Sequence, residues 1–235
     1  HKLPFRFSDL LLANSFAGIK AYGISKNKSN VIYNGFDFNR IANLQDMKTI
    51  RRKFQITTKY VVGMVASFSN LKDYPTYIKA ANNILKNRDD VTFMAIGSGD
   101  SSLYKKYINS KNKNKIVFLK AQENIEDIMN ICDIGVLTSY GEGISNALLE
   151  FSSLEKPILS TNIGGTSEII NNNYNGYLLT PNDVNELSNK IEYLLKNDIK
   201  RKVLGSNAKL VIENKFGIKR MIDSYLKVYK SICAV

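Results

Sequence analysis

Histidine and cysteine are scarce in this 235-residue sequence, and their scarcity excludes two kinds of site. The sequence has one histidine, His1, and two cysteines, Cys132 and Cys233. These side chains are too few for a Cys/His zinc site, and a secreted domain held by disulfides would carry more cysteines. We therefore expect no metal site, no catalytic role for the terminal His1, and two free thiols in a reducing cytoplasm.

Long apolar runs are also absent, and the charge is strongly of one sign. No run approaches the roughly 20 apolar residues of a membrane-spanning helix, while a hydrophobic content of 44% predicts a folded domain. The formal net charge of +12 favours polyanions, anionic lipid or phosphorylated ligands as partners. Because the basic residues form scattered short clusters, nucleic acid is not the expected partner. The expected location is the cytoplasm, with peripheral contact at the inner face of the membrane as a further hypothesis.

Six apolar runs of strand length alternate with segments of helical spacing. The expected strands are 60–67, 91–97, 116–119, 133–139, 157–161 and 176–180, and the expected helices between them are 75–87, 102–110, 124–132, 144–155 and 166–172. The remainder is expected to be helical, with breaks near Gly205 and Gly217. Alternating strands and helices predict an α/β fold with a Rossmann-like, doubly wound parallel sheet.

Residues 1–50 differ in pattern from the rest of the chain. Helical spacing covers 8–22, a short apolar run at 31–37 ends in a turn at Asn34-Gly35, and 47–56 is amphipathic and expected to be helical. This opening stretch is interpreted as a connector into a domain that begins near Tyr60.

The segment 139–170 carries the strongest candidate site. Ligands of open parallel sheets bind at the carboxyl ends of the strands. Glu142 stands in the loop before an expected helix, and Glu150 lies two turns inside that helix. The amides at the helix start would suit a diphosphate, and ribose hydroxyls would give the Glu150 carboxylate the donors that a buried charge needs.

Glu142 and Glu150 have the spacing of the E-x7-E signature of the family 4 retaining glycosyltransferases, which have the GT-B fold. Three further blocks resemble that family in the same order along the chain. They are VIYNGFD at 31–37, VGMVASFSNLKDYPTYIKA at 62–80 and KPILSTNIGGTSEII at 156–170. The chain therefore resembles the C-terminal, nucleotide-sugar-binding half of such an enzyme.

The resemblance implies a role for each matching residue. Glu142, the catalytic candidate, would lie at the donor sugar, and Glu150 would bind the ribose. Other residues would bind the donor around its diphosphate or let the backbone approach the nucleotide. They are Lys72, Ser67, Gly97, Gly143, Ile144, Ser145, Gly164 and Gly165. No cofactor is implied; the donor would be a UDP- or GDP-sugar.

Three positions depart from the family pattern. Ser67 stands where an arginine is usual, so Lys72 would act alone or with a basic residue from elsewhere. Ile144-Ser145 replaces a phenylalanine and a glycine beside the donor, which bears on sugar choice. The glycine often found after the third strand is absent at Lys120-Ala121-Gln122, in the loop near the nucleotide base.

The resemblance also predicts how the chain is divided. Residues 1–50 would be the tail of an N-terminal domain and the interdomain linker, 51–215 the nucleotide-sugar-binding domain, and 216–235 a C-terminal helix. The rest of the N-terminal GT-B domain would be missing, leaving a chain that is inactive alone.

The predicted function is metal-independent transfer of a hexose-type sugar, with retention, to a glycan or lipid-linked acceptor. Absence of a D-x-D motif agrees with metal independence. Two other classes stay open: another GT-B nucleotide-sugar enzyme such as an epimerase, and a non-catalytic basic binding domain.

Overall fold

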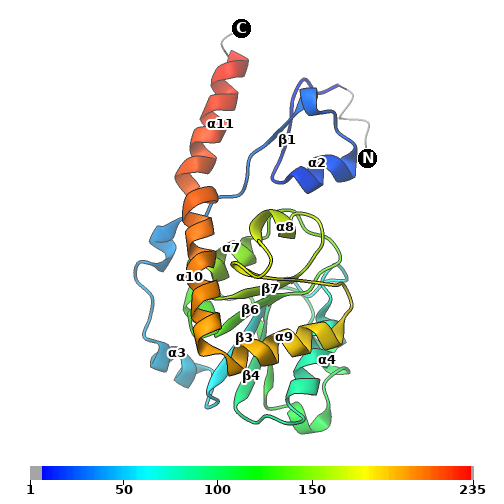
Figure 1. Ribbon diagram of the computed structural model, residues 1–235, viewed down its shortest axis with the longest axis vertical. Helices are drawn as coiled ribbons and strands as arrows, with labels where there is room; N and C mark the ends of the chain where they lie inside the picture. The colour runs from blue at the N-terminus through cyan, green and yellow to red at the C-terminus, as the bar shows by residue number, and fades with distance from the viewer. Residues whose placement is uncertain (1–6, 234–235) are drawn as a thin grey trace.

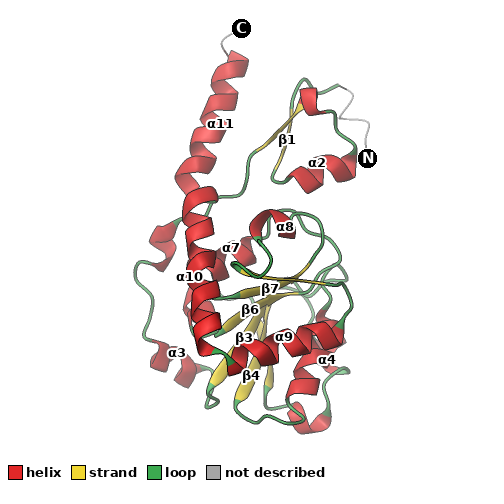
Figure 2. Cartoon of the chain, viewed as in Figure 1, coloured by secondary structure: helices red, strands yellow, loops and turns green. Residues whose placement is uncertain are grey.

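A six-stranded sheet organises the computed structural model, which describes residues 7–233 (Figures 1 and 2). Its strands are β3 (Tyr60–Val65), β4 (Val91–Gly97), β5 (Ile116–Lys120), β6 (Ile134–Leu137), β7 (Ile158–Thr161) and β8 (Gly176–Leu179). The order is β5-β4-β3-β6-β7-β8, and every pair is parallel. His1 and the ends of the predicted segments 1–50 and 216–235 lie outside the described residues.

The sheet confirms the predicted Rossmann-like architecture and all six predicted strands. Strands in the middle of a parallel sheet are covered on both faces, which is why their sequences are continuously apolar; all seven residues of β4 are buried. Strands β4 and β5 are added on one side of β3, and β6, β7 and β8 are added on the other side. As a result β6 lies next to β3 although two strands separate them in sequence. This switch point is where ligands of such sheets bind.

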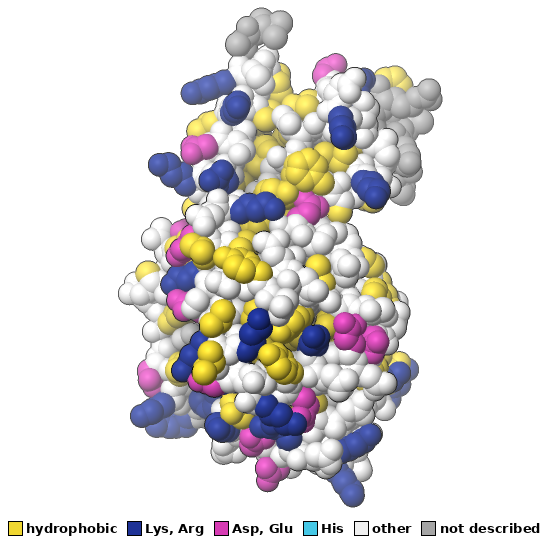
Figure 3. Space-filling view, in the orientation of Figure 1, with side chains coloured by type: hydrophobic (Ala, Val, Ile, Leu, Met, Phe, Trp, Pro, Cys, Tyr) yellow, Lys and Arg dark blue, Asp and Glu magenta, His cyan; other side chains and the backbone are white. Residues whose placement is uncertain are grey.

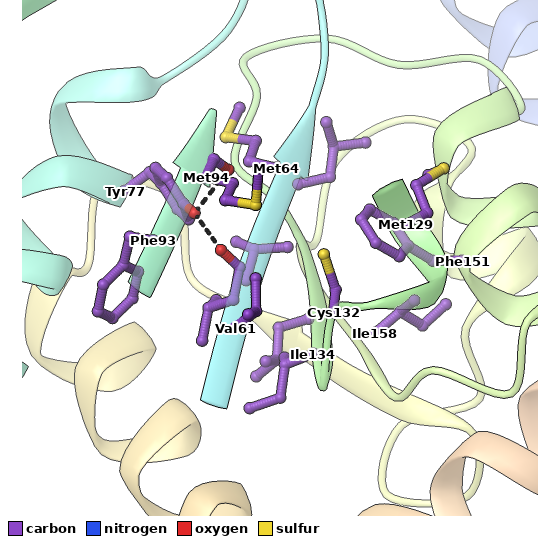
Figure 4. Close-up of a cluster of buried hydrophobic side chains, with 14 of the residues drawn as sticks. Val61, Met64, Tyr77, Phe93, Met94, Met129, Cys132, Ile134, Phe151 and Ile158 are labelled. Carbon is purple, nitrogen blue, oxygen red and sulfur yellow. Dashed lines mark hydrogen bonds between the residues drawn. The ribbon is translucent and has the colours of Figure 1, made fainter. Parts of the chain in front are cut away.

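Helices between and after the strands cover both faces of the sheet. The helices from residue 47 onward are α3 (Met47–Lys53), α4 (Tyr74–Ile84), α5 (Ser102–Lys105), α6 (Ile125–Asn130), α7 (Asn146–Ser153), α8 (Thr166–Ile169), α9 (Val184–Lys196), α10 (Asp198–Lys215) and α11 (Ile218–Cys233), of which α11 extends away from the sheet (Figure 1). Figure 4 shows Tyr77 of α4 on one side of the central strands and Phe151 of α7 on the other. The Tyr77 hydroxyl donates to the carbonyls of Val62 and Met94, at 2.8 and 3.0 Å, so this buried polar group is satisfied.

Phe151 packs into a notch formed by two glycines on the central strands. Gly63 of β3 and Gly135 of β6 are paired in register. A Cβ on Gly135 would lie 2.5 Å from the Phe151 ring, and one on Gly63 would lie 3.2 Å from it. Only glycines leave room for the ring at this depth, so the notch fixes where α7 sits on the sheet.

The first described segment corrects one sequence expectation. Helical spacing across 8–22 holds only for α2 (Phe16–Tyr22), because Leu11–Ala13 is a strand, β1, that pairs in parallel with β2 (Ser29–Val31). Ser15 begins α2, and its hydroxyl accepts from the Gly18 amide at 3.0 Å. An apolar run of three residues fits a helix or a strand equally well, and the partner strand decided between them.

Two further expectations were wrong in detail. The helix expected at 102–110 ends at Lys105. Gly205 does not interrupt the helical end of the chain but lies inside α10, where its missing Cβ lets the helix approach Glu155: a Cβ would lie 2.0 Å from that carbonyl oxygen. The break at Gly217 is confirmed, between α10 and α11.

The C-terminal helix α11 and the segment carrying β1 and α2 lie at one end of the molecule (Figure 1). Phe36 ties the opening segment to the junction of α10 and α11, because its amide donates to the Phe216 carbonyl at 2.7 Å and its carbonyl accepts from the Ile218 amide at 3.0 Å. Cys132 is buried and Cys233 exposed, and both thiols are free. Among residues 7–233, no helix has the length and apolarity to cross a bilayer.

We expect Gly135→Ala to lower the free energy of unfolding by about 1–3 kcal/mol, because the new methyl group overpacks against Phe151. Urea denaturation measures the change. Gly141→Ala is the matched control: a Cβ there meets nothing within 4 Å, so its unfolding free energy should stay close to that of the wild type. Equal stability of the two variants would contradict the notch.

Candidate functional site

The loops that follow β3 and β6 meet at the switch point of the sheet. The Tyr140 amide donates to the Leu71 carbonyl at 2.9 Å, and Lys72 and Ser139 form an antiparallel bridge. The Lys72 ammonium forms an ion pair with Glu142. The structure thus brings together two residues that lie 70 positions apart in sequence and that the sequence assigned to one site.

Glu142 is fixed by its backbone as well as by Lys72. Its carbonyl accepts from the Gly165 amide at 3.0 Å. Gly164 has φ of +55°, and a Cβ there would lie 2.0 Å from the Glu142 carbonyl oxygen. Since the side chains of Lys72 and Glu142 are only 16% and 9% exposed, the pair is held in one place.

Ser67 lies on the loop after β3, and Gly97 is the last residue of the neighbouring strand β4. A Cβ on Gly97 would lie 1.8 Å from the Ala66 carbonyl oxygen, so glycine is required for the end of β4 to approach the loop after β3. The Phe68 amide donates to the Ser98 carbonyl at 2.6 Å, which continues the pairing beyond the strands. Ser67 is exposed, and its hydroxyl lies 3.2 Å from that of Ser69.

The start of α7 offers backbone donors without protein partners. Ser145 is the N-cap residue in extended conformation, and its side chain makes no capping hydrogen bond. Within residues 7–233, the amides of Gly143, Ile144 and Ser145 donate no hydrogen bond to protein. Unpaired amides and the positive end of the helix dipole together favour an anion at this position.

Glu150 has a protein partner that the sequence did not reveal. The Nη2 atom of Arg40 lies 2.8 Å from its Oε1, and the same guanidinium pairs with Glu126. Burial raises the pKa of Glu150, the Arg40 guanidinium acts against that rise, and Glu126 adds to it. Arg40 follows the recognised block 31–37, but nothing local in the sequence connects it with a glutamate 110 residues away.

Other residues of the opening segment also contact the site loops. The Asn34 side-chain amide donates to the Ile144 carbonyl at 3.1 Å and to the Asn146 side chain at 2.9 Å. Glu168 accepts from the first two amides of α2, at 3.0 and 2.9 Å. Asn34 and Glu168 both lie inside the sequence blocks that resemble the glycosyltransferase family, at 31–37 and 156–170, so the resemblance could have indicated both residues.

A second basic residue, Lys106, lines the same open pocket as Lys72. The pocket has a volume of about 350 Å³ and is lined by Asn70, Lys72, Pro75, Leu103, Tyr104, Lys106, Tyr107 and Tyr140. Because it lines the same pocket, Lys106 is the candidate for the basic partner of Lys72 in place of an arginine at Ser67.

The basic side chains of the described residues do not form a single stripe on the face of the molecule in view in Figure 3. Lys and Arg side chains are spread over that face.

A larger pocket lies away from this site, between β5, the start of β4 and the residues that precede β3. Its volume is about 1010 Å³, and its lining includes Thr58, Thr92, Lys113 and Ile116. Over the described part of the chain, no group of three or more His, Cys, Asp or Glu side chains is arranged to hold a metal ion.

The sequence model of the family described as "Glycosyl transferases group 1" matches residues 46–211. An uncharacterised glycosyltransferase of Methanocaldococcus jannaschii is 31% identical over 88% of this chain and 55% of its own length. The chain belongs to this glycosyltransferase family.

Two further relatives are informative about ligands. The Escherichia coli enzyme named UDP-Gal:α-D-GlcNAc-diphosphoundecaprenol α-1,3-galactosyltransferase is 26% identical over 90% of this chain and 56% of its own length. The crystal structure of Anabaena HepE in complex with UDP and glucose superimposes with a TM-score of 0.89 at 26% identity, over 98% of this chain and 65% of HepE. The chain thus spans little more than half the length of the curated relatives it matches.

The raised pKa of Glu150 predicts a pH dependence of stability. A carboxyl with a higher pKa in the folded than in the unfolded state binds its proton more tightly when folded, so the unfolding free energy falls as pH rises from the usual value of 4.5 through the raised pKa. Glu150→Gln should remove this part of the fall. Urea unfolding between about pH 4 and pH 8 measures it.

Exposed Glu123 provides the control for that experiment. Glu123→Gln should keep the wild-type dependence of unfolding free energy on pH. If the unfolding free energy of Glu150→Gln depended on pH as that of the wild type does over the whole range, the raised pKa of Glu150 would be contradicted.

Proposed function

We propose that the chain is the donor-binding part of a retaining, metal-independent glycosyltransferase that uses a nucleoside-diphosphate sugar. The observation that carries this proposal is the arrangement at the switch point of the sheet. Glu142 with Lys72 and the unpartnered amides before α7 lie on the loops after β3 and β6, and Glu150 lies further along α7. These groups would contact the sugar, the diphosphate and the ribose of one ligand.

Positive groups at this site suit the leaving diphosphate. When the bond from the sugar to the diphosphate breaks, negative charge grows on the departing oxygen. The amides of Gly143, Ile144 and Ser145 and the ammonium of Lys72, with Lys106 across the pocket, would stabilise that charge without a metal. A bound phosphate would compete with Glu142 for Lys72.

Glu142 is the proposed catalytic residue. Its carboxylate would lie beside the reacting sugar and would either steady the oxocarbenium-like charge or orient the sugar hydroxyls. Because its backbone carbonyl accepts from the Gly165 amide, Glu142 would stay in place when the diphosphate takes up Lys72. Glu150 would accept hydrogen bonds from the ribose.

A uridine nucleotide is the favoured donor because HepE binds UDP, with a GDP-sugar as the other candidate. The name of the E. coli relative favours a glycan or a lipid-linked diphosphate as acceptor. A lipid-linked acceptor would place the protein at the inner face of the membrane, where a net charge of +12 favours anionic lipid.

The division of the chain is also part of the proposal. Residues 51–215 would form the donor domain, with 1–50 and 216–235 belonging to the connection with an N-terminal acceptor domain. We expect the isolated chain to bind a donor nucleotide but to transfer little or no sugar. Product analysis with donor alone checks the alternative activity, since an epimerised donor would point to an epimerase.

Lys72→Met should weaken UDP binding about ten- to hundredfold, because it removes a charged hydrogen-bond donor from the diphosphate. Titration calorimetry with UDP, GDP and ADP, and their sugars, measures the affinities. Lys111→Met, on an exposed turn, is the control and should bind UDP like the wild type.

The double variant Lys72→Met/Glu142→Gln separates binding from folding, since it leaves no unpaired buried carboxylate at Glu142. It should still bind UDP weakly. Failure of the wild type to bind any of these nucleotides, or wild-type affinity in both Lys72 variants, would overturn the proposed site.

A further inference from the structure

Arg40 is a residue of the opening segment that reaches into the proposed donor site. It lies on a short 3-10 helix, η2 (Phe38–Ile41), that begins at Asp37, whose side chain accepts from the Asn39 amide at 3.0 Å. Its guanidinium lies over the Phe36 ring, 5.3 Å from the centroid. The capped turn and the ring hold the side chain in position beside α7.

Two buried carboxylates face this one guanidinium. The side chains of Glu126, on α6, and Glu150, on α7, are 8% and 12% exposed, whereas that of Arg40 is 44% exposed. The two carboxylates therefore share the positive charge of Arg40. Without Arg40, burial and Glu126 would both favour protonation of Glu150.

Protonation matters because ribose hydroxyls are hydrogen-bond donors. An ionised carboxylate is acceptor-only and can receive both the 2′- and 3′-hydroxyls, whereas a protonated carboxyl presents a donor of its own. Orientation matters too, because a planar guanidinium fixes the carboxylate it contacts. Arg40 would therefore act on both the protonation and the orientation of the Glu150 carboxyl group.

We propose that Arg40 is the positioning residue for ribose recognition: it keeps the Glu150 carboxylate ionised and oriented to accept the 2′- and 3′-hydroxyls of the donor nucleotide. The inference rests on the proposed function of the site. It assigns the ribose contact to a pair from two parts of the chain, a linker arginine and a glutamate of the sheet domain. Selectivity for a ribonucleotide then depends on how the linker is seated.

The test compares ribose with its dideoxy analogue. Affinities of UDP, GDP and their 2′,3′-dideoxy counterparts are measured by titration calorimetry on the wild type, Arg40→Met and Arg40→Lys. The wild type should prefer the ribonucleotide by about tenfold or more. Arg40→Met should lose most of that preference while binding the dideoxy compound within about twofold of the wild type, and Arg40→Lys should recover it in part because it keeps the charge but not the planar fork.

A pH series gives a signature that a merely structural role would not produce. In Arg40→Met, the preference for ribose should shrink further as pH falls from about 8.5 to about 6, because Glu150 takes up a proton. In the wild type it should change less over this range. Arg88→Met, which breaks a pair with Asp90 outside the site, is the control and should keep the wild-type preference.

Each outcome decides the matter. If Arg40→Met and the wild type prefer ribose equally, the inference is overturned although the donor site stands. If the wild type binds none of the nucleotides, the proposed function and the inference fall together. If Arg40→Met does not fold, the double variant Arg40→Met/Glu126→Gln is used in its place, because it has one buried carboxylate fewer. Full ribose preference in that variant would also overturn the inference.

Discussion

Phe151 sits in the space that Gly63 and Gly135 leave open on the two central strands, and the position of α7 depends on it. Helix α7 follows the switch-point strand β6 and carries Glu150 in its middle and unpartnered amides at its start. Residues on a rigid helix keep their mutual geometry, so one packing contact in the core places both halves of the candidate site at once. Close packing without voids makes this contact intolerant of even one added methyl group.

The two carboxylates of the site are each held by a cation from another part of the chain. Lys72 reaches Glu142 from the loop after β3, and Arg40 reaches Glu150 from the opening segment. A carboxylate shielded from water needs such a partner. The opening segment therefore contributes side chains to the candidate site. Asn34 adds a second contact from this segment, with the loop that precedes α7.

The sheet could be predicted from the sequence because each strand is a continuous apolar run with a turn after it, and residue pattern alone determines that. The order of the Glu142, Gly164 and Lys72 blocks likewise indicated one site. Contacts between residues that are far apart in the sequence could not be predicted from local pattern. Leu11–Ala13 became a strand because of β2, and Gly205 was mistaken for a break because its role is close approach to Glu155. Arg40 was missed for the same reason, since its partner is distant in sequence.

A crystal structure of the protein soaked with UDP would show directly where the nucleotide binds. We expect the diphosphate against the amides of Gly143 to Ser145 and the Lys72 ammonium, with both ribose hydroxyls on Glu150. Density for UDP in the pocket between β5, the start of β4 and the residues before β3, with the switch point empty, would contradict the proposed site.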